Sequence, residues 1–431
     1  MKIAAPRRIQ LVCALIASFA APCGYALNPA EPPANYVANH WDTENGLPHN
    51  SIKAIFQTRD GYIWVGTQQG LARFDGLTFT IFTQHNTPSF PNNQITSFAE
   101  TADGSLWIGT SFGLARYQNG RFTSYGRADG LKADTINAVC VAPDGSLWIG
   151  GREGITRWVK GKFVNDIDTS GYEMLGLRSI VVDREKALWL SAGSDAIRYA
   201  NGKLSRFGRA AGLPAQQLQM ICEDATGRIL AVTQNGMFRL DREHFVPLEQ
   251  SASFSSQVAH TALTDRRGNL WVGSVGGLDR YFGGRAMPYV DRSNNKLSVV
   301  DALFEDREGS LWVGTSAGLF RFTDPRASTL STPEGLTGTL AMAVTQTRDG
   351  AVWISTWAGG VDRFLNGTRT HYTQGAPLSQ MTVTAIYEAP DQTMWLGNRG
   401  SSLDRLDGNK ATTFVYQPGV VSSRPVTALY A

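Results

Sequence analysis

Seven residues in turn regions of the sequence are candidates for binding chemistry. Arg152 and Glu153 could hold a polar ligand through charge-assisted hydrogen bonds. Phe112 and Trp357 could stack on a sugar ring. These turns differ most among otherwise similar segments, and variation on a fixed scaffold is where binding specificity can reside. The predicted ligand-binding residues are Gln69, Phe112, Arg152, Glu153, Gln234, Asn235 and Trp357.

The histidines do not indicate an enzyme. The six are His40, His49, His85, His244, His260 and His371. No pair of them has metal-ligand spacing, and none belongs to a recognisable nucleophile or acid–base motif. We therefore predict no catalytic residue, no metal site and no cofactor.

These residues must be positioned by a repeated unit. The stretch from Asp103 to Thr110 recurs every 41 to 43 residues, and an arginine follows each anchor by nine or ten residues. The anchors are Trp64, Trp107, Trp148, Trp189, Leu230, Trp271, Trp312, Trp353 and Trp395. The arginines are Arg73, Arg116, Arg157, Arg198, Arg239, Arg280, Arg321, Arg363 and Arg405. A period near 40 residues with one tryptophan per unit predicts a repeat fold, in which the arginines form a structural ring.

One unit reads as four short strands. Within residues 94–125, strands are expected at 94–100, 106–110, 114–117 and 121–125, with glycine turns between them and no helical period. Such an antiparallel sheet buries both faces when successive sheets stack radially. The sequence thus predicts an all-β fold, a β-propeller of four-stranded antiparallel blades with each tryptophan between neighbouring blades. A solenoid of β-arches fits less well, because it has shorter coils and no four-strand meander.

The two ends of the repeat region suggest how the units divide. Residues 36–41 resemble a fourth, outermost strand without a blade of its own, so we expect them to close a seven-bladed ring over 36–324. Residues 325–431 would be an incomplete second propeller of two blades, followed by a first-strand stub at 425–431 that resembles 381–388. A single nine-bladed ring is the alternative, but it leaves the N-terminal strand and the stub without partners.

Residues 1–26 read as a signal peptide. Lys2, Arg7 and Arg8 precede an apolar run at 11–21, and Gly24-Tyr25-Ala26 offers small residues for cleavage after Ala26. The apolar run is shorter than the roughly 20 residues of a membrane span. The formal net charge of +3 includes those three cations, and no basic run suggests nucleic acid.

Two cysteines remain after this leader. Cys140 and Cys222 hold the same first-strand position two units apart, which should exceed the roughly 7 Å Cα limit for a disulfide. Both are expected to be small buried apolar side chains and not a redox or metal pair.

The repeat resembles the two-component regulator propeller repeat. The motif appears as an acidic-Gly turn, then Ile63-Trp64-Val65-Gly66-Thr67, then Gly70-Leu71-Ala72-Arg73-Phe74, and it recurs around Trp312. The resemblance covers residue 36 to the end. It implies the periplasmic sensor half of a bacterial inner-membrane receptor whose output is a histidine kinase or diguanylate cyclase.

The resemblance also sets expectations for function and partners. Family members typically have two seven-bladed rings, a small β-sandwich, a membrane helix and an output domain, so this chain reads as truncated before its membrane and output parts. We expect a ligand-sensing module without catalysis, located in the periplasm. Its expected partner is a small-molecule or saccharide ligand and not nucleic acid, with a homodimer of the full receptor as an open option.

Two enzyme readings and a soluble periplasmic binding protein are the alternatives. A streptogramin-type lyase is similar in having one seven-bladed ring and an Asp-x-x-Gly-x-Ile/Leu-Trp turn. It requires histidine and acidic side chains that converge on the ring axis. A quinone-dependent dehydrogenase would need eight blades and metal ligands that the sequence does not offer.

Overall fold

The computed structural model describes residues 26–429, except for 173, 235, 249–257, 292, 326–335, 339, 366–367, 376, 401, 409 and 416–424. Residues 1–25, and with them nearly all of the predicted signal peptide, lie outside the described residues. The chain divides into two compact units, Met1–Pro325 and Arg326–Ala431. No helix in the described part has the length and apolar character needed to cross a membrane.

The described part of the first unit contains seven four-stranded sheets. Six are made of consecutive strands: β2 (Ile52–Gln57), β3 (Ile63–Thr67), β4 (Leu71–Phe74) and β5 (Phe79–Phe82); β6 (Ile95–Glu100), β7 (Leu106–Thr110), β8 (Leu114–Gln118) and β9 (Arg121–Tyr125); β10 (Ile136–Val141), β11 (Leu147–Gly151), β12 (Gly154–Val159) and β13 (Lys162–Val164); β14 (Ser179–Val182), β15 (Leu188–Ala192), β16 (Asp195–Ala200) and β17 (Lys203–Phe207); β18 (Leu218–Glu223), β19 (Ile229–Thr233), β20 (Gly236–Asp241) and β21 (His244–Pro247); β22 (Ala259–Thr264), β23 (Leu270–Ser274), β24 (Gly277–Phe282) and β25 (Arg285–Pro288).

The seventh sheet combines β26 (Val300–Glu305), β27 (Leu311–Thr315) and β28 (Gly318–Thr323) with β1 (Val37–Trp41). Short 3-10 helices connect some elements: η1 (Pro33–Asn35), η2 (Thr43–Asn45), η3 (Arg127–Asp129), η4 (Met174–Gly176) and η5 (Arg209–Ala211).

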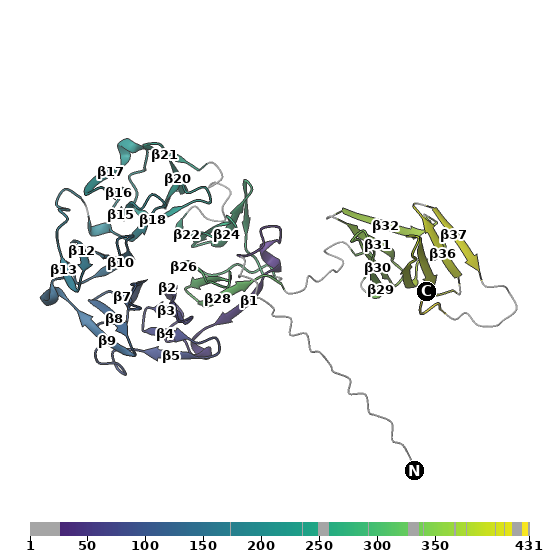
Figure 1. Cartoon of the computed structure of the whole chain (residues 1–431), viewed down its shortest axis with the longest axis horizontal. Helices are drawn as coiled ribbons and strands as arrows, with labels where there is room; N and C mark the ends of the chain where they lie inside the picture. Colours follow the sequence, from purple (N-terminus) through teal and green to yellow (C-terminus); the bar gives the residue numbers. More distant parts are fainter. Residues whose placement is uncertain are drawn as a thin grey trace, which may run out of the picture. The chain divides into compact units, whose positions relative to one another are not determined.

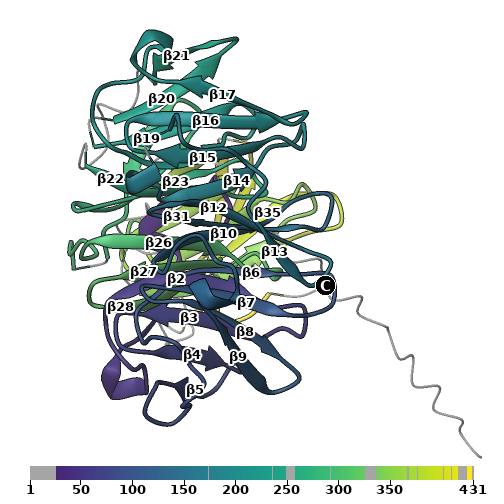
Figure 2. The ribbon, with the colours of Figure 1, turned by 90° about the vertical axis from the view of Figure 1, so that its left-hand side faces the viewer.

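The sheets of the first unit are arranged radially, with the first strand of each sheet nearest the centre (Figure 1). Figure 2 shows this order from the side, where β14 to β17 follow one another outward. The predicted meander over 94–125 is confirmed by β6 to β9, with antiparallel pairing throughout. The fold is an all-β propeller.

The N-terminal strand joins the two ends of the first unit. β1 pairs antiparallel with β28, from Val37 opposite Thr323 to Trp41 opposite Leu319. The Trp41 ring stacks on Trp312 with a centroid distance of 5.5 Å. The outer edge of β28 is thereby paired, and β1 becomes the outermost strand of this sheet, as the fourth strand does in the other six.

The repeated tryptophans and arginines are cross-strand partners. In all nine units the anchor on the second strand lies opposite the arginine on the third, as with Trp107 opposite Arg116. The Arg116 guanidinium lies 5.4 Å from the Trp107 ring centroid and 2.9 Å from the turn carboxylate of Asp103. Trp107 also packs on Trp158 of the next sheet at 5.1 Å, so the tryptophan lies between sheets as predicted.

Most described tryptophan N–H groups in the first unit have an acceptor six residues earlier. Trp107 Nε1 donates to Thr101 Oγ1 at 3.1 Å, and Trp312 Nε1 donates to Asp306 Oδ2 at 2.7 Å. Trp148 has Ala142 at that position, and its Nε1 has no hydrogen-bond partner among the described residues. A buried donor without a partner carries a desolvation cost.

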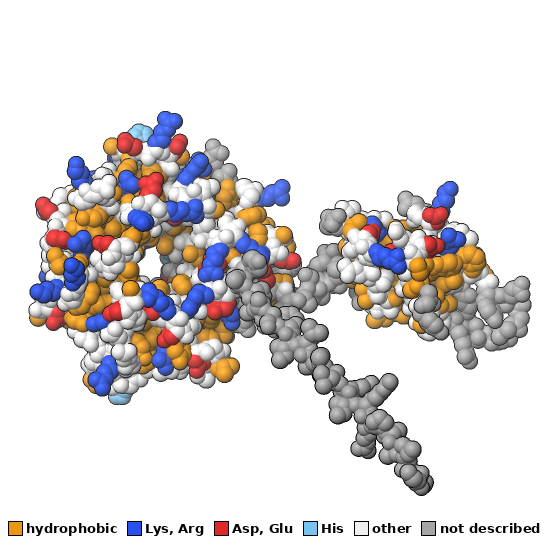
Figure 3. All heavy atoms as spheres, in the orientation of Figure 1, with side chains coloured by type: hydrophobic (Ala, Val, Ile, Leu, Met, Phe, Trp, Pro, Cys, Tyr) orange, Lys and Arg blue, Asp and Glu red, His pale blue; other side chains and the backbone are white. Residues whose placement is uncertain are grey.

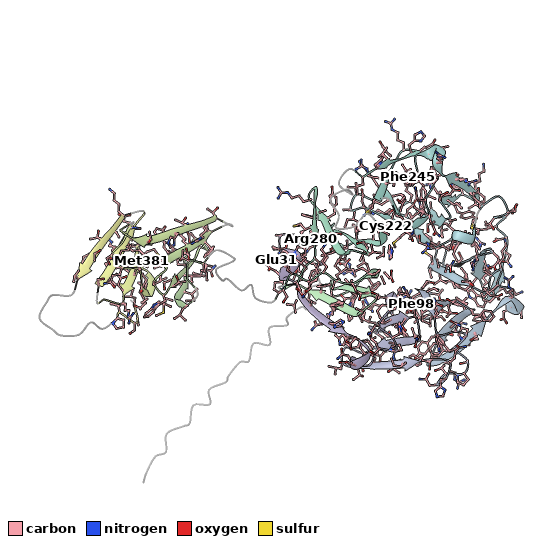
Figure 4. The ribbon with its side chains drawn as sticks, turned by 180° about the vertical axis from the view of Figure 1, so that it is seen from behind. Glu31, Phe98, Cys222, Phe245, Arg280 and Met381 are labelled. Carbon is pink, nitrogen blue, oxygen red and sulfur yellow. The ribbon has the colours of Figure 1, made fainter. Side chains whose placement is uncertain are left out.

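Residues 26–36 pack against the β22–β25 sheet. Arg280 is 1% exposed, and its guanidinium donates to the carbonyl oxygen of Glu31 at 2.7 Å and to the hydroxyl of Tyr36. Figure 4 shows Arg280 and Glu31 side by side at this sheet. Tyr36 also packs on Trp271 at 6.1 Å. The segment before β1 is therefore an integral part of the first unit.

The second unit has two sheets in its described part. One contains β29 (Ala341–Gln346), β30 (Val352–Thr356), β31 (Gly360–Leu365), β32 (Thr368–Gln374) and β33 (Pro377–Leu378). The other contains β34 (Val383–Glu388), β35 (Met394–Asn398), β36 (Ser402–Asp407) and β37 (Lys410–Val415).

The predicted first-strand stub has no regular strand in its described residues, 425–429. Val426 nevertheless makes the contacts of a first-strand residue. Its side chain lies over Gly397, as Ile95 lies over Gly66 in the first unit. The carbonyl oxygen of Val426 accepts from Thr384 Oγ1 at 2.7 Å, as Ile136 O accepts from Thr96 Oγ1 at 2.6 Å.

Candidate functional site

One position at the start of the first strand of each sheet, or directly before that strand, faces the axis of the first unit. It is occupied by seven different polar residues, spaced 41 residues apart except for 43 between the first two. They are Lys53, Thr96, Asn137, Arg178, Gln219, His260 and Asp301. We call them the axial ring.

A local backbone irregularity places these residues. The pairing of the first strand with the second shifts register at six of the seven positions, for example between Val300 and Ala302, which brackets Asp301. Arg178 lies just before β14, and its N–H donates to the carbonyl oxygen of Ser191 at 3.0 Å. A bulge leaves one residue outside the ladder and redirects its side chain. In six of the seven sheets it directs a polar side chain towards the axis of the first unit.

The axial ring lines a cavity of about 690 Å³. Figure 3 shows the hollow at the centre of the first unit. Turn residues Arg152 and Gln234 contribute to the lining, together with Thr135 and Gln217, which precede first strands. Leu177 is the one large apolar side chain, and no Phe, Tyr or Trp is among the described residues that line this cavity. The volume is in the range of small-molecule sites, but its walls are unusually polar.

Hydrogen bonds between neighbouring sheets hold part of the ring in place. Asn137 Nδ2 donates to the carbonyl oxygen of Leu177 at 2.8 Å, directly before Arg178. Thr96 Oγ1 makes the corresponding bond to Ile136, directly before Asn137. Each of these side chains therefore fixes the backbone next to the following ring residue.

Asp301 is the charged centre of one side of the cavity. Its Oδ2 accepts from Lys53 Nζ at 2.6 Å, and its Oδ1 lies 2.8 Å from His260 Nδ1. Burial alone would raise the pKa of Asp301, but the hydrogen bonds from His260 and Lys53 outweigh it and hold that pKa below its usual range. The carboxylate is therefore ionised at neutral pH.

This contact sets the tautomer of His260. Because an ionised carboxylate only accepts hydrogen bonds, His260 Nδ1 must carry the proton. In the neutral imidazole, Nε2 is then the acceptor and can take a proton from a bound group. The pair can orient a ligand hydroxyl or act as a base.

The basic groups on the other sheets have no such acidic partner. Arg178 donates to Gln217 Oε1 at 3.2 Å, and within the described residues neither Arg152 nor Arg178 forms a salt bridge. Glu153, next to Arg152, is 3.1 Å from Arg127 and is thus engaged outside the cavity. The cavity lining therefore has an excess of positive charge.

The seven predicted ligand-binding residues are placed as follows. Arg152 and Gln234 line the axial cavity. Gln69 and Phe112 lie in equivalent β-turns, where their N–H groups donate to Thr67 and Thr110, and Phe112 is 63% exposed. Glu153 pairs with Arg127, and Asn235 lies outside the described residues. Trp357 belongs to the second unit, with the Arg399 guanidinium 4.2 Å from its ring centroid.

The sequence analysis did not identify the axial ring. It identified only Arg152 and Gln234, turn residues that line the same cavity. A column-by-column comparison of the repeats contains the signal: a polar residue of changing identity follows an apolar one at each first-strand start, as in Ile52-Lys53 and Val300-Asp301. The pairing of His260 with Asp301 had no sequence motif, because the two belong to different units. No group of three or more His, Cys, Asp or Glu side chains in the described part could hold a metal ion.

The chain matches a known repeat family. Residues 46–69, 89–112 and 294–317 match the model of the two component regulator propeller. These three segments contain the axial residues Lys53, Thr96 and Asp301. None of the curated proteins searched matches the chain.

Solved structures share the fold at low sequence identity. The extracellular domain of a hybrid two component system from B. thetaiotaomicron is 18% identical with a TM-score of 0.64, covering 90% of this chain and 55% of that one. The extracellular domain of a one component system from the same organism is 21% identical with a TM-score of 0.57, covering 89% and 54%. This chain therefore spans about half the length of these extracellular domains.

A virginiamycin B lyase from Staphylococcus aureus, solved with quinupristin, is also similar. It is 14% identical with a TM-score of 0.53, and the match covers 67% of this chain and 99% of the lyase. At these identities the likeness concerns the fold alone.

Proposed function

Because the chain carries repeats of the two component regulator propeller, we propose that it is the ligand-sensing propeller module of a bacterial transmembrane receptor, exported to the periplasm. The observation that carries the proposal is the axial ring. Seven equivalent positions hold seven different polar side chains around one cavity, whereas the surrounding strand positions keep repeated apolar or small residues. A purely structural position would be expected to repeat its residue, as the tryptophans do.

The receptor context is supported by the family of the repeat and by the extracellular domains that share its fold. In this proposal, the output domain belongs to a part of the receptor beyond this chain. The ligand binds in the axial cavity and changes the balance between two states of the receptor through its different affinity for them.

The first test is the DNA sequence downstream of the codon for Ala431. An open frame that continues through further tryptophan repeats into a membrane helix and a kinase or cyclase would support the receptor. An in-frame stop codon directly after Ala431 would exclude transmembrane signalling by this polypeptide and favour a soluble binding protein.

The second test concerns the cavity. A thermal-shift screen of small periplasmic metabolites and saccharides would compare the native chain with Gln219→Leu, which removes a polar group from the ring, and with the exposed control Leu77→Ser. We expect hits that stabilise the native and control proteins but not Gln219→Leu. Hits that are indifferent to Gln219→Leu would place the ligand elsewhere.

A second candidate function is lyase chemistry, and a specific observation favours it. The lyase reading requires histidine and acidic side chains on the axis of one ring, and His260 and Asp301 meet there at 2.8 Å. Incubation with quinupristin followed by mass spectrometry tests it. A cleavage product that disappears in His260→Ala would establish the lyase, and unchanged antibiotic would leave the sensor as the better proposal.

A further inference from the structure

We propose that the axial cavity of the first unit binds an anionic ligand, a hydroxylated carboxylate, whose acidic group contacts Arg152 and Arg178. This inference rests on the proposed function, because it names the ligand class of the same sensory cavity.

The charge distribution supports an anion. Three permanently or normally cationic side chains line the cavity, Lys53, Arg152 and Arg178, and Asp301 is the one acidic side chain among the lining residues. That carboxylate is already shared between Lys53 and His260. Glu153, the acid next to Arg152 in sequence, pairs with Arg127. The two arginines therefore keep their charge for a ligand.

The two arginines lie on one part of the ring, so they would determine where the acidic group of the ligand binds. Arg152 is in the β11–β12 turn and Arg178 precedes β14, so they belong to consecutive sheets. Asp301 is on β26, His260 on β22 and Lys53 on β2, on the other part of the ring (Figure 1). A guanidinium presents paired donors that match a carboxylate, and a site walled by protein concentrates the field of such charges.

The remaining lining fits a body rich in hydroxyl groups. Asn137, Gln217, Gln219 and Gln234 offer amides, and Thr96 and Thr135 offer hydroxyls. The described lining residues include no Phe, Tyr or Trp that could stack on a sugar face, so a neutral sugar would depend mainly on hydrogen bonds that compete with water. A negative group adds charge-assisted bonds to this set. Uronic acids are one chemical class with both features.

The first experiment measures the sign of the electrostatic potential in the cavity and does not require the ligand to be known. Thr96→Cys places a thiol in the axial ring, and its rates of modification by an anionic and a cationic methanethiosulfonate reagent are compared. The native chain, without the Thr96→Cys substitution, is treated in the same way, and the reaction of its own cysteines is subtracted. We expect a higher rate for the anionic reagent and a several-fold loss of this preference when Arg178→Gln is added.

The matched control is Leu77→Cys, on an exposed turn whose leucine is 89% exposed. Adding Arg178→Gln should not change the relative rates at this position. A Thr96→Cys thiol with no preference for the anionic reagent, or a preference that survives both Arg152→Gln and Arg178→Gln, would overturn the proposal.

The second experiment uses calorimetry with galacturonate, galactose and inorganic phosphate on the full chain. We expect galacturonate to bind, galactose to bind at least about tenfold more weakly, and Arg178→Gln to lose about tenfold or more in affinity for galacturonate. If phosphate binds and galacturonate does not, the cavity is an anion site, but the proposal that its ligand is a carboxylate is wrong. Galactose binding with the same affinity as galacturonate would contradict the proposal that the ligand is an anion.

The two proposals fail differently. If the cavity binds a neutral ligand that controls a receptor output, the sensor stands and the anionic class is wrong. If galacturonate binds to the cavity but the reading frame stops at Ala431, the ligand class stands and the transmembrane sensor is wrong.

Discussion

The ammonium group of Lys53 lies 2.6 Å from a carboxylate oxygen of Asp301, although 248 residues separate them in the sequence. Lys53 is on β2 and Asp301 on β26, so the contact joins the first sheet of the chain to the last sheet of the first unit. The same carboxylate orients His260. One carboxylate therefore links the first and last sheets of the first unit and orients a second residue of the axial ring.

Asp301→Asn should lower stability in a pH-dependent manner. The pKa of Asp301 is held below its usual range, so the ionised group contributes stability above the pKa it has in the unfolded chain, and this contribution is lost as the pH falls through the lower, folded-state pKa. We expect a loss of about 1–3 kcal/mol near neutral pH, because charge-assisted hydrogen bonds disappear.

Urea unfolding of the native chain and Asp301→Asn over a series of pH values checks this. The difference in unfolding free energy should shrink on acidification, and Lys53→Met should weaken its pH dependence. A difference that stays constant with pH would show that the charge of Asp301 is not what stabilises the site.

Trp41→Ala should destabilise the first unit by opening its closure. Trp41 packs on Trp312 and on Phe74, at centroid distances of 5.5 and 5.3 Å, and thus connects β1 to β27 of its own sheet and to β4 of the neighbouring sheet. We expect a loss of about 3 kcal/mol. Val37→Ala is the matched control on the same strand, because Val37 is 46% exposed, and should change stability by less than about 0.5 kcal/mol.

Denaturant unfolding and limited proteolysis measure both variants. Deletion of residues 36–41 should give an aggregated or protease-sensitive product, since the edge of β28 then becomes free and the Trp41 contacts are lost. A deletion variant as stable as the native chain would contradict closure by β1.

Ala142→Thr should stabilise the protein. Trp148 Nε1 lacks an acceptor among the described residues, and Thr101 supplies that acceptor to Trp107 at the equivalent position. A new hydroxyl should add about 1 kcal/mol, and Thr101→Ala should remove about the same amount. Ala142→Val, which adds the bulk without the hydroxyl, is the control. Thermal unfolding in which Val stabilises as much as Thr would assign the gain to packing.

Tyr36→Phe should destabilise the N-terminal segment and change how the free energy of unfolding depends on pH in the alkaline range. Burial raises the pKa of Tyr36 to about 12, although the nearby Arg280 opposes the increase. Its neutral form therefore contributes stability below its unfolded-state pKa, which is lost as the pH rises through the folded-state value. Removing the hydroxyl that Arg280 contacts should cost about 1–3 kcal/mol.

Tyrosinate absorbance provides the measurement. At about pH 11, the native chain and Tyr36→Phe should give the same signal while folded, and differ by one tyrosinate after unfolding. A tyrosinate signal from Tyr36 in the folded chain at that pH would show that the hydroxyl is not buried.

The sequence by itself determined the repeating architecture. Strand positions, glycine turns and the tryptophan–arginine pairing are local to one unit of about 40 residues, so period and alternation are enough to predict them. Trp107 and Arg116, for example, are nine residues apart in sequence and opposite each other across a hairpin. The turn residues Arg152 and Gln234 were predicted as ligand contacts because turns vary, and both line the cavity.

Only the tertiary structure decided how units combine. Lys53, His260 and Asp301 come from three different units, and no local pattern relates their side chains. The register shift that directs six of the seven ring residues to the axis is an irregularity of backbone pairing, which hydrophobic alternation does not encode. The site is therefore a property of the ring: each unit supplies one polar side chain, and radial packing brings the seven together.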